Sequence, residues 1–418
     1  MENNSAVALF LALAIVIGAS RIGGAIARTL NQPRVLGELI LGVILGPTLL
    51  NMLGWDVFHG AELSNIIKEL AELGVLFLMF LVGIEVNPHE LREVGKVSVF
   101  AGVFGALAPV IVTIPIVLLF NYSWEAALFA GITFAATSVS ISAQVLLELG
   151  VLRTREGNAL LATAVIDDIL AIILVSLAIA ITASTGTTET SAGIGEMIGI
   201  VIRMFAFMGI AFLIAWYALP KVIDWINHQP VLQHAAGMPA FALIFMLFFA
   251  WSAEAFGGVA PITGAFIAGI GFSRVSGHVK HEVEVTASSI AYAFLVPVFF
   301  INVGLETNLS QFQLATIPLT VIFVLIAVAT KVFGCGLGAR AGGFNQAEAT
   351  RLGVCMISRG EVGLIIASLG IKAGVFTADS QLFIALFATI ILTTLITPIL
   401  VRQVFHSSIT PQSAPQTR

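Results

Sequence analysis

Long apolar stretches separated by short polar segments run along nearly the whole chain. A helix needs about 20 apolar residues to cross the hydrocarbon core of a membrane. The pattern therefore predicts an all-α membrane protein with about 13 transmembrane helices. The predicted spans cover residues 5–28, 33–53, 70–88, 96–120, 125–150, 157–183, 194–220, 237–257, 259–273, 285–305, 315–338, 350–371 and 379–401.

The composition agrees with a membrane protein. The chain is 58% hydrophobic and only 10% charged, whereas soluble domains carry about 25% charged residues. It has no basic run of the kind that binds nucleic acid. Cys335 and Cys355 lie inside apolar segments without metal-ligand spacing, so we expect two core residues and no cofactor. No nucleophile–base arrangement suggests an enzyme.

The basic residues predict how the chain is oriented. Most of the 19 Lys and Arg residues follow odd-numbered spans, and short loops rich in these residues stay in the cytoplasm. We expect the N-terminus outside and the C-terminus in the cytoplasm. The polar, Pro-rich segment 406–418 reads as a disordered tail.

The sequence also repeats itself at a shift near 220 residues. Because the two units lie seven spans apart, the second copy is inverted, an arrangement typical of secondary transporters. The matching stretches are "FLVGIEVN" (80–87) with "FINVGLETN" (300–308), "GELILGVILG" from Gly37 with "GAFIAGIG" from Gly264, and "AQVLLELGV" (143–151) with "GLIIASLGIKAGV", which aligns Gly150 with Gly370.

Two spans at corresponding positions of the repeat are interrupted by polar residues. "TSVSIS" (137–142) aligns with "ISRGEV" (357–362). Hydroxyls such as those of Thr137 and Ser138 can bond backbone groups that a helix break frees. The alternative is that Ser and Thr are close-packing residues at a helix interface. The symmetry of the two interruptions favours two broken helices, whose ends carry partial charges suited to ions.

Charged residues inside the spans are the candidates for chemistry. Asp167 and Asp168 lie in the span after the first break, and Lys331 is an intramembrane lysine. Intramembrane acids are functional by default, and a buried lysine needs a carboxylate partner. We predict a Lys331–Asp167 pair, which leaves Asp168 to bind a proton or a hard monovalent cation together with hydroxyl and carbonyl oxygens.

Other intramembrane charges receive weaker predictions. Arg359 and Glu361 are expected to satisfy each other through the second break or to neutralise half-helix ends. Glu38, Glu85 and Glu306 lie near span ends and read as interfacial or packing acids. The pattern assigns no role to Arg203 or Glu254.

Taken together, these motifs resemble the monovalent cation:proton antiporter-2 family, and within it the sodium/proton antiporters with a paired-aspartate motif. The resemblance covers nearly the whole chain: "QPRVLGELILGVILGP", "FLVGIEV", "ATSVSISAQVL", "AVIDD", "PVFFINVGLE" and "SRGEVGLIIA" occur in the family's order. Some antiporters place an acid in the first break, where this chain has only hydroxyls.

The resemblance implies roles for single residues. Asp168 matches the essential aspartate that binds ion and proton, Asp167 its neighbour, and Lys331 the lysine that pairs with it in electrogenic members. Thr137 and Ser138 match the break that lends oxygens to the ion, and Thr163, one turn before Asp167, is a weaker candidate. The sodium ion is then expected at Asp168 and Asp167.

The resemblance also implies a sodium/proton antiporter fold and a homodimer in the bilayer. The expected parts are 1–92 (spans 1–3) and 231–311 (spans 8–10) as a dimer domain, 93–183 (spans 4–6) and 312–405 (spans 11–13) as a core ion-transport domain, and 184–230 as a linker helix.

The leading functional hypothesis is an antiporter of the plasma (inner) membrane. It exchanges cytoplasmic Na⁺ or Li⁺ for external H⁺ by alternating access, electrogenically. Potassium/proton exchange is the alternative within the same class, because nothing in the sequence separates these ions. A passive channel needs a selectivity filter or charge ring, and none is visible. An organic-anion symporter would need a roomier polar cavity than one lined by paired acids and a lysine.

Overall fold

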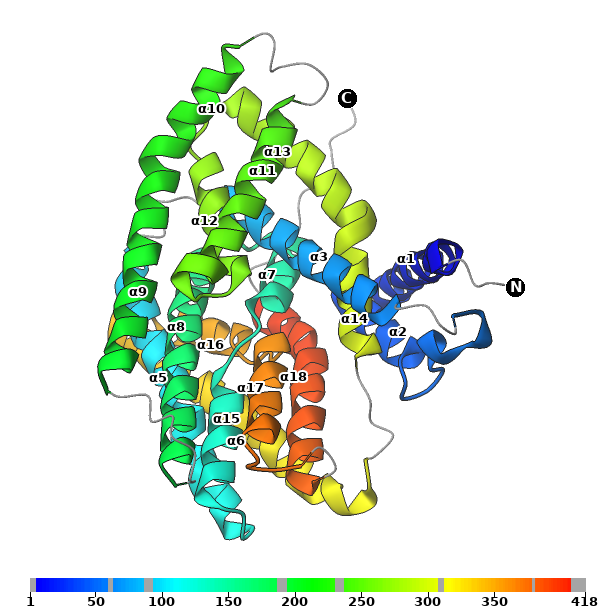
Figure 1. Ribbon diagram of the computed structural model, residues 1–418, viewed down its shortest axis with the longest axis vertical. Helices are drawn as coiled ribbons and strands as arrows, with labels where there is room; N and C mark the ends of the chain where they lie inside the picture. The colour runs from blue at the N-terminus through cyan, green and yellow to red at the C-terminus, as the bar shows by residue number, and fades with distance from the viewer. Residues whose placement is uncertain are drawn as a thin grey trace.

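The computed structural model describes residues 5–58, 63–85, 93–185, 194–229, 237–306, 312–377 and 380–406. All regular elements in these stretches are helical (Figure 1). Among them, nine helices are long and apolar enough to cross a membrane, and shorter apolar helices lie between them. The all-α prediction is confirmed. The count of thirteen spans stays a prediction, and the tail from residue 407 lies outside the described residues.

The helices lie where spans were predicted, but some bounds differ: α2 ends eight residues before the predicted 53, α3 begins seven before 70, and α13 begins eight before 285. Their bounds are α1 Ser5–Thr29, α2 Arg34–Leu45, α3 Leu63–Glu85, α5 Gly95–Leu119, α6 Trp124–Ala135, α7 Val139–Glu148, α8 Arg155–Thr185, α9 Ile194–Leu213, α10 Leu219–Asn227, α11 Gly237–Ser252, α12 Pro261–Phe272, α13 Gly277–Ile290, α14 Val296–Leu305, α15 Ile317–Gly342, α16 Gln346–Cys355, α17 Glu361–Lys372 and α18 Gln381–Phe405. Short π-helical turns, η3 (Ile214–Ala218), η4 (Ala253–Gly257) and η5 (Ala291–Leu295), continue α9, α11 and α13.

One group of helices, α1–α3 with α11–α14, packs through glycines that the repeat relates. In α2 against α14, a Cβ on Gly42 would lie 2.4 Å from the Ile301 carbonyl oxygen. In α3 against α12, a Cβ on Gly83 would lie 2.4 Å from the Phe266 carbonyl oxygen. Gly42 meets Gly304 in the first crossing, and Gly83 meets Gly269 in the second. The two crossings are copies of each other, which supports the inverted repeat.

The second group contains α5–α8 and α15–α18, in the lower half of Figure 1. Helix α5 crosses its repeat mate α15, and small residues let the backbones approach. A Cβ on Gly338 would lie 2.3 Å from the Phe100 carbonyl oxygen, and the sulfur of Cys335 packs against Gly105. Both cysteines are buried, as the sequence predicted.

Two helices of this group are broken where the sequence predicted it. Residues 136–138 separate α6 from α7, and residues 356–360 separate α16 from α17. The alignment after the breaks needs one correction. The glycine with positive φ that ends α7 is Gly150, but the one that ends α17 is Gly374, not Gly370. The second copy is therefore four residues longer here than the alignment assumed.

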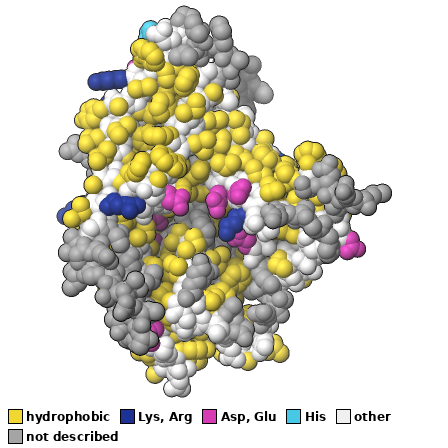
Figure 2. All heavy atoms as spheres, in the orientation of Figure 1, with side chains coloured by type: hydrophobic (Ala, Val, Ile, Leu, Met, Phe, Trp, Pro, Cys, Tyr) yellow, Lys and Arg dark blue, Asp and Glu magenta, His cyan; other side chains and the backbone are white. Residues whose placement is uncertain are grey.

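The outer surface is largely apolar. Large hydrophobic side chains with more than half of their surface exposed include Phe10, Phe205, Phe248 and Phe333, as a lipid-facing surface requires. Figure 2 shows hydrophobic side chains over most of one face, with acidic and basic side chains gathered across its middle. Helices α9 and α10 line one edge (Figure 1). There Arg203 donates from Nε to the Phe256 carbonyl of η4 at 2.7 Å, a partner the sequence did not indicate.

Candidate ion-binding site

The two helix breaks cross each other at Ser138 and Ser358, residues 220 apart in sequence. The Ser138 N–H donates to the Ser358 carbonyl (3.0 Å), and the Ser358 hydroxyl donates to the Ser138 carbonyl (2.5 Å). The repeat mates thus satisfy backbone groups that the breaks free, as buried polar groups require. A Cβ on Gly360 would lie 2.7 Å from the Ser138 side chain, so only glycine fits there without displacement.

A further hydroxyl completes the crossing. Ser142 donates to the Cys355 carbonyl at the end of α16 (2.6 Å) and lies 3.2 Å from the Ser358 hydroxyl. Ser138 and Ser140 are 3.1 Å apart through their hydroxyl oxygens. These contacts argue against the alternative that the serines serve only close packing, because each serine hydroxyl makes a specific hydrogen bond.

Arg359 neutralises the C-terminal end of the half-helix α16. It is fully buried, and its NH1 donates to the carbonyls of Met356 and Ile357, both at 3.2 Å. Its NH2 donates to Ala327 of α15 at 3.3 Å, and its own carbonyl accepts a hydrogen bond from Thr394 of α18. A helix C-terminus carries partial negative charge, so a cation there is stabilising. This geometry is compatible with the neutralisation of a half-helix end, one of the two roles considered for Arg359.

Lys331 and Asp167 form a buried ion pair between α15 and α8. The lysine Nζ lies 3.0 Å from Oδ1 and 3.3 Å from Oδ2 of the carboxylate, and both side chains are at most 1% exposed. The contact predicted from the sequence is present. A buried charge without a partner costs several kcal/mol. Removing either residue of the pair should therefore destabilise the protein.

Asp168 differs from its neighbour because its side chain is partly exposed, whereas Asp167 is buried. Adjacent helix positions are about 100° apart, so the two carboxylates face different surroundings. Asp167 is committed to Lys331. Asp168 is therefore the more accessible carboxylate of the pair.

Besides Thr113 and Thr316, two predicted site residues have buried hydroxyls that lack hydrogen-bond partners among the described residues. They are Thr137 in the first break and Thr163 on α8, four residues before Asp167. Unsatisfied buried polar atoms are rare and need an explanation, such as an ion or water. Hydroxyl and carboxylate oxygens are the donors that a hard cation takes. The donor set fits a monovalent cation, and no cluster of three or more His, Cys, Asp or Glu suited to a transition metal occurs in the described parts.

Glu361 is the first residue of α17, but its side chain lies outside the described residues. The contact between Arg359 and Glu361 therefore stays a prediction. Glu85 pairs with Arg153 (3.6 Å) and Glu306 with Lys68 (4.0 Å), which agrees with their interfacial assignment.

Sequence reasoning did not single out Ser358 or Thr394. Ser358 could have been found, because the 220-residue shift aligns it with Ser138. Thr394 could not, because its contact with the Arg359 carbonyl depends on how α18 packs against the break.

Comparison with known proteins gives the family. The description "Sodium/hydrogen exchanger, transmembrane" matches residues 11–406. The Na(+)/H(+)-K(+) antiporter GerN of Bacillus cereus is 35% identical over 396 residues, which are 95% of this chain and 96% of GerN. A Na(+)/H(+) antiporter of Enterococcus hirae is 33% identical over 390 residues, 93% of this chain and 96% of its own.

A solved structure shares the fold. The sodium proton antiporter MjNhaP1 from Methanocaldococcus jannaschii superposes with a TM-score of 0.68 at 18% identity, covering 97% of this chain and 98% of its own. The family match over most of the chain and the identity to antiporters of similar length lead to one assignment. The chain belongs to the sodium/hydrogen exchanger family of membrane proteins.

Proposed function

We propose that this protein is a secondary antiporter that exchanges cytoplasmic Na⁺ or Li⁺ for external H⁺. The observation that carries the proposal is the buried Lys331–Asp167 pair, next in sequence to the partly exposed Asp168. An unsatisfied hydroxyl lies one turn before Asp167 at Thr163, and another lies in the first break at Thr137. A site of this kind can hold either a cation or protons. Exchange follows because the two compete for the same carboxylates.

The cation would take oxygens from Asp168, Thr137 and Thr163. As it approaches, it competes with Lys331 for Asp167, and the released lysine can lose its proton. Asp168 loses a second proton when it binds the cation. After sodium leaves on the outside, the site binds two protons there and returns with them to the inside. Two protons then move inward for each sodium moved out, which makes transport electrogenic. The two acids and the lysine would titrate as one coupled unit.

Alternating access in this proposal uses the two helix groups as separate bodies. The group α5–α8 with α15–α18 is the transport core and carries the ion. The group α1–α3 with α11–α14 forms the contact of a homodimer in the plasma membrane, and α9 links the two. The glycines of α2 and α12 pack against other helices of the same chain, so the dimer contact in this proposal rests on the family resemblance alone. The basic loops support an external N-terminus and a cytoplasmic C-terminus.

Potassium remains the second candidate ion, because the printed name of GerN includes K(+). The oxygen ligands do not separate the two ions by type. The number of ligands and the size of the cavity would determine which ion is selected.

The experiment measures current and pH change on proteoliposomes fused to solid-supported membranes, with sodium, lithium and potassium applied in turn. Proton movement opposite to sodium, with net positive charge following the protons, is expected. A sodium flux without opposing proton movement would contradict the proposal. A response to potassium alone would show that potassium, and not sodium, is the substrate.

A further inference from the structure

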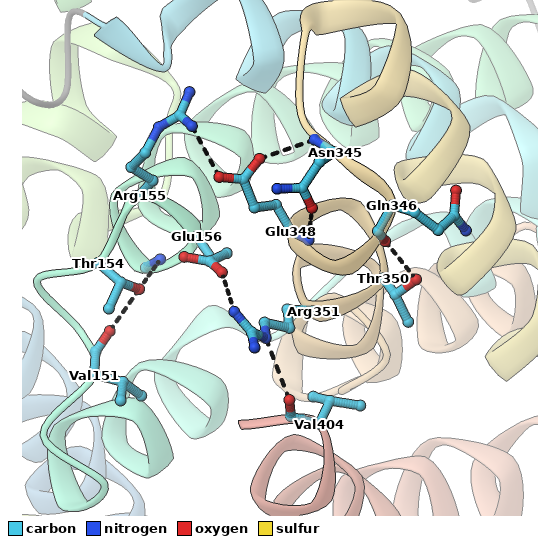
Figure 3. Close-up of polar contacts among 11 residues, drawn as sticks. Val151, Thr154, Arg155, Glu156, Asn345, Gln346, Glu348, Thr350, Arg351 and Val404 are labelled. Atoms are coloured by element: carbon cyan, nitrogen blue, oxygen red, sulfur yellow. Dashed lines mark hydrogen bonds and ion pairs between the residues drawn. The ribbon is translucent and has the colours of Figure 1, made fainter. Parts of the chain in front are cut away.

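Four charged side chains join the first turn of α8 to α16 by two ion pairs (Figure 3). Arg155 NH1 lies 2.8 Å from Glu348 Oε1, and Arg351 NH1 lies 2.8 Å from Glu156 Oε1. We call these four residues the α8–α16 clamp. Arg351 also donates from Nε to the Val404 carbonyl of α18 (3.3 Å), so the clamp ties three helices together.

The clamp has a fixed geometry. Glu348 accepts a hydrogen bond from the Asn345 N–H (2.9 Å) through Oε2, while Asn345 accepts one from the Glu348 N–H (3.0 Å), which closes a capping box at the start of α16. The Arg351–Glu156 pair is the more buried, with side-chain exposures of 21% and 8%. Its members are therefore held by packing as well as by charge.

The inverted repeat provides an internal comparison for this junction. Thr154 precedes α8 and accepts a hydrogen bond from the Gly157 N–H, and Ser380 precedes α18 and accepts one from the Phe383 N–H. The two caps share the same local pattern, so they align the mate helices residue by residue. Glu156 then corresponds to Leu382.

The partner helices align in the same way. Asn345 caps α16 and Ser123 caps α6, so counted from the caps Glu348 corresponds to Ala126 and Arg351 to Phe129. Counted back from the break, at a shift of 220, they correspond to Leu128 and Gly131, which are also apolar and buried. The inner pair, Glu156 and Arg351, is thus apolar in the other copy, and so is the mate of Glu348, whereas Arg155 corresponds to the polar, exposed Gln381. Ala126, Phe129 and Leu382 all lie buried in one hydrophobic cluster.

This asymmetry argues against stability as the reason for the clamp. Well-packed apolar residues stabilise a junction as well as a buried ion pair does, or better. The mate helix α18 contains no Asp or Glu, whereas α8 carries Asp167 and Asp168. The charged junction is found in the copy whose helix holds the transported ion.

We propose that the α8–α16 clamp positions the ion site by fixing the register of α8 against the second broken helix. Asp167 follows Glu156 by 11 residues, about 16 Å along one continuous helix. Arg351 lies on α16, which ends at the break that carries Arg359. A slip of α8 along α16 would move Asp167 and Asp168 away from the crossing, and ligand geometry tolerates only about 0.5 Å. This inference rests on the proposed sodium/proton exchange.

The test replaces the inner ion pair by apolar residues. The double variant Glu156→Leu, Arg351→Met is expected to melt within about 3 °C of wild type, since its junction resembles the natural apolar copy. Its KM for sodium should rise about tenfold with little change in kcat, and its pH profile should shift. Arg351→Met alone leaves Glu156 unpaired and should melt well below the double variant. Thr350→Ala is the matched control, because that hydroxyl bonds the Gln346 carbonyl of its own helix (2.9 Å).

A double variant with wild-type melting temperature, KM and pH profile would overturn the proposal. If the double variant does not fold, Glu156→Gln and Arg351→Lys take its place. A raised KM in either supports the clamp, and an unchanged KM in both overturns it. Sodium binding to wild-type protein by calorimetry keeps the two hypotheses separate: binding without proton exchange contradicts the proposed function, while a clamp variant with unaltered affinity contradicts only the clamp.

Discussion

Asp167 and Asp168 are neighbours in sequence but differ in what surrounds them. Asp167 is buried and forms an ion pair with Lys331, whereas Asp168 is partly exposed. The pairing could be predicted because charges in apolar spans are rare and need partners. The repeat pointed to Ser358 through its alignment with Ser138, whereas the hydrogen bond of Thr394 depends on how α18 packs against the break, which no local pattern encodes.

Asp168→Asn is expected to abolish exchange of every cation, because an amide cannot lose and regain a proton. The substitution is isosteric, so the protein should still fold. Proton-coupled sodium flux in proteoliposomes measures the effect, with thermal unfolding as the folding control. Exchange above one-tenth of wild type would contradict the role of Asp168.

Lys331→Gln should remove one titrating proton and move transport toward electroneutral exchange. It also leaves Asp167 without its cation, at an expected cost of about 3–5 kcal/mol. Reversal potentials under a sodium gradient test the first effect, and chemical unfolding tests the second. An active variant whose reversal potential equals that of wild type would show that the lysine does not carry a transported proton.

At the scale of elements, the internal repeat predicted much of how the helices are arranged. The two breaks and the inversion follow from matches of a few residues, whereas the glycine crossings were found only in the structure. The alignment erred by four residues between Gly370 and Gly374, because the second break is two residues longer than the first and α17 is two residues longer than α7. Apolar periodicity alone did not reveal this length difference.

The glycine crossings predict a symmetric pattern of destabilisation. Gly42→Ala and Gly269→Ala should both lower the melting temperature, because each new Cβ would lie under 2.5 Å from a carbonyl oxygen of the opposing helix. Gly18→Ala is the matched control: nothing lies within 4 Å of its Cβ, so the better helix propensity of alanine should leave stability equal or raise it by up to about 1 kcal/mol. Equal melting temperatures for all three variants would refute the tight crossings.

At the scale of the whole molecule, polar contacts join the two helix groups at the end of α7. Glu148 accepts a hydrogen bond from the Arg34 N–H at the start of α2 (2.8 Å), Tyr292 donates to Gln144 (3.4 Å), and Arg153 pairs with Glu85. None of these contacts was predicted from the sequence. In the proposed mechanism they must break whenever the groups separate.

Glu148→Ala should therefore loosen this side of the molecule. It removes the acceptor for the first N–H of α2, a capping contact of about 1 kcal/mol. Hydrogen–deuterium exchange at the start of α2 is expected to become roughly fivefold faster. Glu125→Ala, which also removes one acid, should leave that segment unchanged. If both variants exchange alike, the contact does not hold the two groups together.

The two cysteines give the protein its own reporters of rigidity. Cys335 is sealed in the crossing of α5 and α15 and Cys355 at the end of α16, both fully buried and both thiols. A transport core that moves as one body never opens either position. Neither thiol should then react with a membrane-permeant alkylating reagent during turnover, although the same reagent should modify both after unfolding. Alkylation that accelerates only when sodium and a proton gradient are present would mean that the core itself deforms as the ion crosses.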